Sequence, residues 1–261
     1  MERGFDSKRV LVTGAGKGIG LACARAFLLA GARVVGVARN PHTLAAARDA
    51  LAGEGLDMRV EAADLVDAQA AGTLVDRVEK ELGAIDVLVC AAGAARRYGP
   101  DELDAAAYRQ AMDAKYFATM HVVQPVIARM AGRGQGSIVA IVGQGGRQAN
   151  PMHIAGGAAN SALMLATVGL ARAYAARGVR VNAINPGLTR TSRVEEGIEA
   201  EARATGRDSA ELLEAAIARI PMGRMAEPGE IAEVALFLAS PRASYVSGAI
   251  IPMDGCAASV I

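Results

Sequence analysis

Val10-Leu11-Val12-Thr13-Gly14-Ala15-Gly16-Lys17-Gly18-Ile19-Gly20 is the stretch of this 261-residue chain that decides its fold. A short apolar run ends in a glycine-rich turn, and an alanine-rich helical pattern follows directly. Glycines allow a buried strand to turn tightly and let the backbone approach a pyrophosphate, which the free N–H groups of the next helix bind. Because strand, turn and helix occur together, we predict a dinucleotide site at Gly14, Lys17, Gly18, Ile19 and Gly20; a simple tight turn is the alternative.

Short β-branched runs alternate with alanine-rich helical patterns along the rest of the chain. Most of these runs are continuously apolar, which is typical of strands buried on both faces of a parallel sheet. The alternation predicts an α/β fold of one domain over residues 1–261, a doubly wound parallel sheet between two helical layers. The candidate strands are 9–13, 33–38, 58–62, 87–90, 137–142, 180–184 and 249–253, and the candidate helices are 19–30, 41–52, 68–82, 103–131, 152–176 and 230–239.

Residues 193–220 interrupt this alternation. They form a charged helical insertion of Glu, Arg and Ala without a candidate strand. Two interpretations fit: a solvated pair of helices, or a lid over the carboxyl edge of the sheet, where insertions commonly gate ligand sites.

The charge balance and the rare residue types argue against several classes of protein. The 28 basic and 27 acidic side chains leave a net charge of +1 without a basic tract, so we expect no nucleic-acid partner. No apolar run reaches about 18 residues and no signal segment precedes the first strand, so we expect no membrane contact and a cytoplasmic setting. Cys23, Cys90 and Cys256 are isolated, and the three histidines lack ligand spacing, which argues against disulfides and metal sites.

The residues after the second and third candidate strands indicate which dinucleotide binds. An acidic residue after the second strand would bind the ribose 2′-hydroxyl of NAD(H), but the strand ends in Ala38 and Arg39. Arg39 and Lys17 can neutralise a 2′-phosphate, so NADP(H) is preferred over NAD(H) unless Arg39 is merely solvated. Asp64 is a candidate acceptor for the adenine amino group, or alternatively the cap of the next helix.

Five motifs in order give the chain a resemblance to the short-chain dehydrogenase/reductase family over essentially its whole length. They are Thr13-Gly14-x-x-x-Gly18-x-Gly20, Asp64-Leu65, Cys90-Ala91-Ala92-Gly93 where the family has Asn-Asn-Ala-Gly, Arg180-Val181-Asn182-Ala183-Ile184-Asn185-Pro186-Gly187, and the ending from Gly223-Arg224 to Asp254-Gly255. The resemblance implies a seven-stranded Rossmann-type sheet, a nicotinamide cofactor, and a homodimer or homotetramer formed through the long helices after the fourth and fifth strands. It also implies cofactor contacts at Leu65, Ala91, Ala92, Gly93, Pro186, Gly187 and Thr189.

The resemblance further implies four catalytic residues, and this sequence departs from all of them. Family members use a tyrosine as proton donor, a lysine four residues later, a serine, and an asparagine on a neighbouring helix. Alignment from the flanking strands puts Gly143, Gly156, Asn160 and Lys115 at the positions of the serine, tyrosine, lysine and asparagine, respectively. No shift of register restores the pair, because Lys115 is the last of four lysines and no tyrosine occurs between positions 117 and 173. We therefore expect a non-standard active site.

His153 and Lys115 are the candidates for a replacement acid or base. His153 lies seven residues before Asn160, which is the tyrosine-to-lysine spacing in the enoyl-reductase branch of the family, and histidine titrates near neutrality. The alternative is a polar residue at a strand-to-helix turn. Lys115 is expected to project toward the vacated site, where a lysine in apolar surroundings can act as a base; surface exposure or cofactor contact is the alternative.

Two further features concern the substrate. Gly156-Gly157 inside an expected helix costs about 1 kcal/mol per glycine relative to alanine, so space is wanted there, for a bulkier ligand or for close contact between subunits. Arginines at the carboxyl edge of the sheet can attract an anionic small-molecule substrate or form a solvated rim. These arginines are Arg96, Arg97, Arg147 and Arg190.

Three functions fit these observations. The first is an atypical NADP(H)-dependent oxidoreductase that acts on a small carbonyl or conjugated substrate. The second is a non-redox enzyme on the same scaffold, such as a lyase, isomerase or cyclase. The third is a catalytically inactive NADP-binding regulatory subunit.

Overall fold

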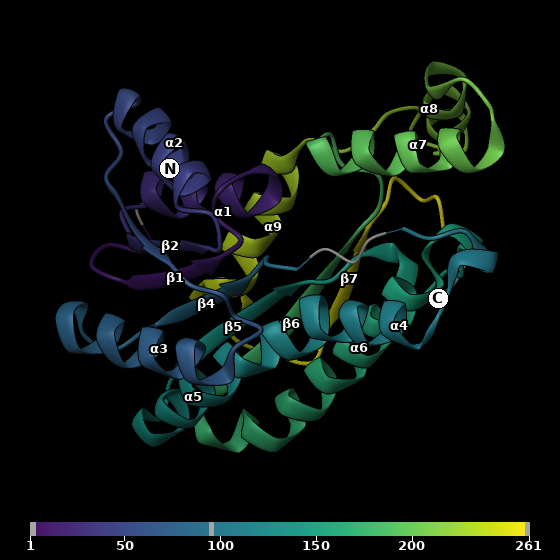
Figure 1. The fold of residues 1–261 in the computed structure, drawn as a ribbon. Helices are drawn as coiled ribbons and strands as arrows, with labels where there is room; N and C mark the ends of the chain where they lie inside the picture. The colour runs from purple at the N-terminus through teal and green to yellow at the C-terminus, as the bar shows by residue number, and fades with distance from the viewer. Residues whose placement is uncertain (1–3, 94–96, 259–261) are drawn as a thin grey trace.

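A sheet of seven parallel strands forms the centre of the molecule (Figure 1). The computed structural model describes residues 4–93 and 97–258. The strands are β1 (Arg9–Thr13), β2 (Arg33–Ala38), β3 (Met58–Ala62), β4 (Val87–Cys90), β5 (Gly136–Ile141), β6 (Val179–Pro186) and β7 (Ile250–Met253). They lie in the order β3-β2-β1-β4-β5-β6-β7. The predicted doubly wound parallel sheet is therefore confirmed, and four strands have the predicted bounds.

Helices cover both faces of the sheet (Figure 1). One layer contains α1 (Gly18–Leu29), α2 (Pro41–Gly53) and α9 (Pro228–Ala239), and the other contains α3 (Ala68–Leu82), α5 (Ala118–Arg133) and α6 (Ile154–Tyr174). Successive residues of β1 contribute to opposite layers: Leu11 packs with α3, α5 and α6, whereas Val10 and Val12 pack with α1 and α9. The two faces are thus filled by aliphatic side chains, as the continuously apolar strands predict.

The predicted continuous helix over 103–131 is wrong, because this segment changes its helical type along its length. It contains α4 (Ala105–Ala111), a π-helical segment (Met112–Phe117) and then α5. Asp104 caps α4 by accepting a hydrogen bond from the N–H of Ala107 at 2.7 Å, so the helix begins only after that residue. In the π-helical segment the backbone carbonyl of Lys115 accepts a hydrogen bond from Thr119 Oγ1 at 2.8 Å. π-helical turns are rare in proteins, and those that do occur are often found at functional sites.

The insertion at 193–220 folds as two helices beyond the carboxyl edge of the sheet, drawn in green in Figure 1. These are α7 (Ser192–Thr205) and α8 (Ser209–Ala218), which pack against each other. Asp208 caps α8 by accepting hydrogen bonds from the N–H groups of Ala210 and Glu211. Both interpretations of the insertion, a solvated helix pair and a lid, predict helices, so the helices alone do not distinguish them.

The stretch Pro151–Arg177, which includes α6, is long and apolar enough to cross a membrane by length and composition. The buried core helix of a folded domain can meet the same criterion. In this structure α6 packs against β6 and contributes Leu163 and Ala171 to the core. A membrane span is therefore not needed to explain its apolar character.

Candidate active site

The carboxyl ends of the strands open into a cleft of about 1100 Å³. Every residue predicted for the cofactor and for catalysis lines it: Gly14, Lys17, Gly18, Ile19, Gly20, Arg39, Asp64, Leu65, Ala91, Ala92, Gly93, Lys115, His153, Pro186, Gly187 and Thr189. The insertion supplies a further wall through side chains of α7 and α8, including Val194, Ile198 and Leu212. It therefore borders the cleft rather than lying apart from it.

The glycine-rich turn leaves no room for side chains. Gly14 and Gly18 have φ values of +73° and +58°, which only glycine adopts freely. A Cβ on Gly14 would also lie 2.6 Å from the carbonyl oxygen of Ala91. Thr13 Oγ1 accepts a hydrogen bond from the N–H of Ala92 at 3.2 Å and so holds the loops after β1 and β4 together.

The first turn of α1 is prepared for an anion. Its N-cap residue, Lys17, makes no side-chain hydrogen bond to the first turn. By contrast, Asn40 caps α2 and Asp67 caps α3, each through two backbone N–H groups. The N-terminus of a helix with unbonded N–H groups attracts negative charge, so the turn before α1 fits the pyrophosphate of a dinucleotide.

Two basic side chains, Arg39 and Lys17, line the cleft at and near the glycine-rich turn. Arg39 is exposed after β2 and makes no hydrogen bond or ion pair to another described side chain. Lys17 Nζ contacts Ser192 Oγ at 3.0 Å and Glu196 Oε1 at 3.3 Å, so the glycine-rich turn meets the start of α7. Asp64 Oδ1 accepts a hydrogen bond from the N–H of Val66 at 3.1 Å and does not cap α3. The alternative role of Asp64 as a helix cap is therefore wrong, and Asp64 lines the cleft, so a contact with the adenine amino group stays a prediction.

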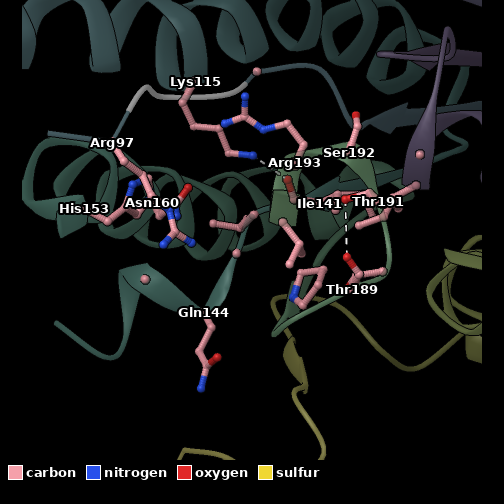
Figure 2. A pocket seen from close by; sticks show the side chains of 18 of the residues that line it. Arg97, Lys115, Ile141, Gln144, His153, Asn160, Thr189, Thr191, Ser192 and Arg193 are labelled. Carbon is pink, nitrogen blue, oxygen red and sulfur yellow. Dashed lines mark hydrogen bonds between the residues drawn. The ribbon is translucent and has the colours of Figure 1, made fainter. Parts of the chain in front are cut away.

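Lys115 is a buried amine in the π-helical segment, with 7% of its surface exposed. Its Nζ donates a hydrogen bond to the carbonyl oxygen of Ile141 at 2.8 Å, and no carboxylate in the described part of the chain pairs with it (Figure 2). Burial, followed by the positive charge of Arg193, lowers the pKa of Lys115 to about 8, although the Cys90 thiol opposes this. Surface exposure, the alternative placement, is thus wrong.

The imidazole of His153 occupies the space that a side chain at Gly156 would need. A Cβ on Gly156 would lie 2.5 Å from His153 Nε2 and 2.7 Å from Nδ1. His153 Nδ1 is buried and has no hydrogen-bond partner among the described residues. Burial and then the charges of Arg97, Arg193 and Lys115 lower the pKa of His153 to about 4, so the ring is neutral at pH 7. Gly156 therefore makes room for the imidazole rather than for an enlarged cavity.

Asn160 and Gly143 meet at the floor of the cleft. Asn160 is 5% exposed, and a Cβ on Gly143 would lie 3.1 Å from its Nδ2. The N–H of Gly143 donates to Asn185 Oδ1 at 3.1 Å. The amide of Asn160 is therefore a polar group that borders the cleft.

Arginines that line the cleft differ from those expected. Arg97 lies in it, but Arg147 is exposed outside it, and Arg190 pairs with Glu227 away from it. Arg96 lies outside the described residues. The insertion instead contributes Arg193, Arg207 and Arg219 to the lining.

Comparison with known proteins identifies the family. A family model described as Enoyl-(Acyl carrier protein) reductase matches residues 14–256. Galactitol 2-dehydrogenase (L-tagatose-forming) of Cereibacter sphaeroides is 38% identical over 253 residues, which cover 96% of this chain and 95% of that protein. This chain belongs to the short-chain dehydrogenase/reductase family.

Two further comparisons support the assignment to the short-chain dehydrogenases/reductases. Cis-4-hydroxycyclohexanecarboxylate dehydrogenase of Sinomonas cyclohexanicum is 37% identical over 261 residues and covers 98% of both proteins. The crystal structure of L-sorbose reductase from Gluconobacter frateurii, with NADPH and L-sorbose, has a TM-score of 0.91 and 27% identity, with 100% of both chains covered.

The asparagines that helped to indicate the short-chain dehydrogenase/reductase family have structural partners here. Asn182 Nδ2 donates to the carbonyl oxygen of Val246 at 2.9 Å, and its Oδ1 accepts from the N–H of Ala249 at 3.0 Å. Asn185 positions Gly143 as described. These two residues therefore tie β6 to the segments beside it, and Asn185 holds Gly143, which lines the cleft.

Sequence reasoning missed the three cleft arginines of the insertion. The high arginine content of residues 193–220 was a signal, but which of them face the sheet depends on how α7 and α8 dock. Nor does the sequence indicate that the imidazole of His153 packs against Gly156, the residue three positions later in the chain.

Proposed function

We propose that this protein is an NADP(H)-dependent oxidoreductase that acts on a small carbonyl or conjugated substrate without the serine, tyrosine and lysine of its family. The observation that carries the proposal is Lys115, a buried amine without a carboxylate partner among the described residues, which lines the same cleft as the glycine-rich turn. A buried charge is costly, and one retained in a cleft with a shifted pKa is typical of a functional site.

Lys115 can perform the proton transfer that the missing tyrosine would have performed. A nicotinamide cofactor bound in the cleft supplies a hydride to the substrate carbon, or accepts one from it. When a carbonyl is reduced, its π electrons move to the oxygen, which must then gain a proton. The ammonium group of Lys115 donates one of the two N–H bonds that Ile141 does not use, becomes a neutral amine, and regains a proton from solvent in the cleft. In the oxidation direction the neutral amine accepts the proton from the alcohol.

His153 is proposed to orient the substrate oxygen. Because its ring is neutral near pH 7, it donates a hydrogen bond through one nitrogen and accepts one through the other. Nδ1 is itself buried, so a substrate hydroxyl or carbonyl in the cleft would hydrogen-bond to the other ring nitrogen, Nε2. This assigns the proton to Lys115 and positioning to His153.

The cofactor preference is supported by charge. Arg39 follows a β2 strand that ends in Ala38 rather than in an acidic residue, and an exposed guanidinium can bind a 2′-phosphate in a bidentate manner. L-Sorbose reductase, with the similar structure, contains NADPH. We propose NADP(H) on these grounds.

A homodimer or homotetramer formed through α5 and α6 is also proposed. Leu165 on α6 is 76% exposed, and Phe117 at the start of α5 is 41% exposed. Association through these helices would cover both side chains. Light scattering on the purified protein gives the oligomeric state directly.

Lys115→Met tests the proposed reaction. The variant is compared with wild type on a panel of ketones and conjugated enones, with oxidation of NADPH followed by absorbance. Loss of the proton donor should lower kcat about 10²- to 10⁴-fold. Lys80→Met, which removes an exposed lysine on α3, is the matched control and should leave kcat unchanged. In wild type, reduction should slow as pH rises through about 8, because only the ammonium form donates a proton.

Three results would contradict the proposal. Undiminished turnover in Lys115→Met would remove this residue from the reaction. Substrate conversion without any change in nicotinamide absorbance would favour a lyase, isomerase or cyclase. A wild-type protein that binds NADPH but turns over nothing in the panel would favour a regulatory subunit.

A further inference from the structure

The cleft is strongly basic where the insertion, the loop after β4 and the π-helical segment line it. Arg97, Lys115, Arg193, Arg207 and Arg219 line it there, and Glu201 is the only acidic side chain among the described residues of that lining. Glu196, which is outside the lining, pairs with Arg193 at 2.9 Å. Ile198 and Leu212, which are 8% and 4% exposed, border the same region. Several cations beside an apolar wall fit a ligand that has an apolar body and a negatively charged group.

Arg97 packs against α7 in this basic region. Its guanidinium lies against Gly197 of α7, where a Cβ would be 2.9 Å from Arg97 Cζ, so the absence of a side chain at Gly197 makes room for it. Arg97 makes no hydrogen bond or ion pair to another described side chain, although Glu201 is near enough to interact electrostatically. Burial lowers the pKa of Arg97, as does the charge of Arg193. A half-buried guanidinium held beside a second cation is a binding group for an anion.

Both arginines lie close to the proposed reacting groups. Figure 2 shows Arg97 and Arg193 among the side chains that line the pocket with Lys115, His153 and Asn160. The charges of Arg97 and Arg193 both lower the pKa of His153. From this arrangement we infer that the substrate carries a strong anion, a carboxylate or a phosphate monoester, which Arg97 and Arg193 bind next to the reacting oxygen. The inference rests on the proposed function, because it names the substrate class of the same site.

Binding of such an anion has an electrostatic consequence at His153. The charged groups that face its ring are Arg97 from the loop after β4, Arg193 from α7 and Lys115 from the π-helical segment. An anion between the arginines offsets two of these three charges. The pKa of His153 therefore rises from about 4 when the ligand binds, and NMR titration of the ring follows this directly.

The test measures equilibrium binding, which needs no turnover. Oxo acids of three to six carbons and dihydroxyacetone phosphate are titrated by calorimetry into the protein with and without NADP⁺. Each is paired with its neutral counterpart, the methyl ester or dihydroxyacetone. We expect at least one anion to bind about 10- to 100-fold more tightly than its counterpart, as one or two charge-assisted hydrogen bonds imply. A carboxylate and a phosphate monoester are distinguished by which arm shows the preference.

The variants locate the site. Arg97→Gln and Arg193→Gln should each weaken binding of the anion about tenfold or more and leave the affinity for the neutral counterpart unchanged. Arg97→Lys, which keeps the charge but loses the planar fork, should recover part of the affinity for the anion. Arg147→Gln, an exposed arginine outside the cleft, is the matched control and should bind like wild type.

The outcomes separate this inference from the proposed function. It is overturned if no anion binds more tightly than its counterpart, if Arg97→Gln weakens both equally, or if Arg147→Gln has the same effect. An anion that binds as predicted but is never reduced refutes the redox proposal alone. Turnover of neutral ketones without preference for acids or phosphates refutes the anion site alone.

Discussion

Gly156→Ala tests the arrangement of His153 most directly. A Cβ at this position would lie 2.5 Å from Nε2 and 2.7 Å from Nδ1 of the imidazole, whereas ordinary contact begins at about 3.5 Å. The ring must therefore retreat by about 1 Å or leave the site. Replacing glycine by alanine inside a helix would otherwise stabilise the protein by about 1 kcal/mol.

Gly169→Ala is the reference variant for the stability gained when alanine replaces glycine inside a helix. Gly169 lies on the same helix, is exposed, and has no atom within 4 Å of the position of a Cβ. In a protein of this size about 1 kcal/mol corresponds to a rise in Tm of about 2–4 °C. We expect this rise for Gly169→Ala and no rise for Gly156→Ala, because displacement of the imidazole offsets the helical gain.

A double-mutant cycle isolates the cause. In a His153→Ala background the clash is absent, so Gly156→Ala should raise Tm by about 2–4 °C, like Gly169→Ala. Calorimetry or circular dichroism of the four variants measures the coupling. If Gly156→Ala stabilises the wild type as much as Gly169→Ala does, the imidazole does not occupy this space and the assignment of His153 to the site fails.

Two further predictions concern Lys115 and Arg39. Because the folded-state pKa of Lys115 is lowered from 10.5 to about 8, its charge destabilises the folded protein below pH 8, and stability is regained as pH rises from about 8 to 10.5. Lys115→Met should therefore raise the free energy of unfolding at pH 7 by at most about 3 kcal/mol. Urea denaturation should show that this gain in stability is smaller at pH 10. A variant that is less stable than wild type at pH 7 would contradict the prediction. Arg39→Ala should weaken binding of NADPH about tenfold or more and leave NADH unchanged in fluorescence titrations, since in the proposed binding mode only a 2′-phosphate would contact this side chain. Equal weakening of both cofactors would refute the proposed preference.

Most of the sheet follows from the sequence, since the apolar runs are bounded by glycine and charged residues. β6 is longer than predicted, because Asn185 and Pro186 still pair with Pro252 and Met253 of β7. Hydrophobic pattern does not show that pairing. The break at Met112–Phe117 escaped prediction because a π-helical turn adds one residue locally, and periodicity averaged over a long helix conceals it.

The candidate site divides in the same way. Backbone requirements specify the glycine-rich turn, so its residues could be named from spacing alone. Arg193, Arg207 and Arg219 depend on how two helices dock against the sheet, and that is decided by packing between distant segments. The alignment predicts that Lys115 projects toward the vacated site, and Lys115 does line the cleft, but the depth at which its amine is buried depends on packing around the π-helical segment.

The π-helical segment makes the position of Lys115 depend on the length of the chain. A π-helical turn accommodates one residue more than the α-helical path between the same two ends, and each residue of an α-helix turns the chain by about 100°. Deletion of a single codon within Met112–Phe117 would let the segment continue as an ordinary α-helix into α5. The packing of α5 against α3 could then persist while the amine rotated out of the cleft. The gene thus has a point at which deletion of one residue would abolish the proposed chemistry without rebuilding the fold.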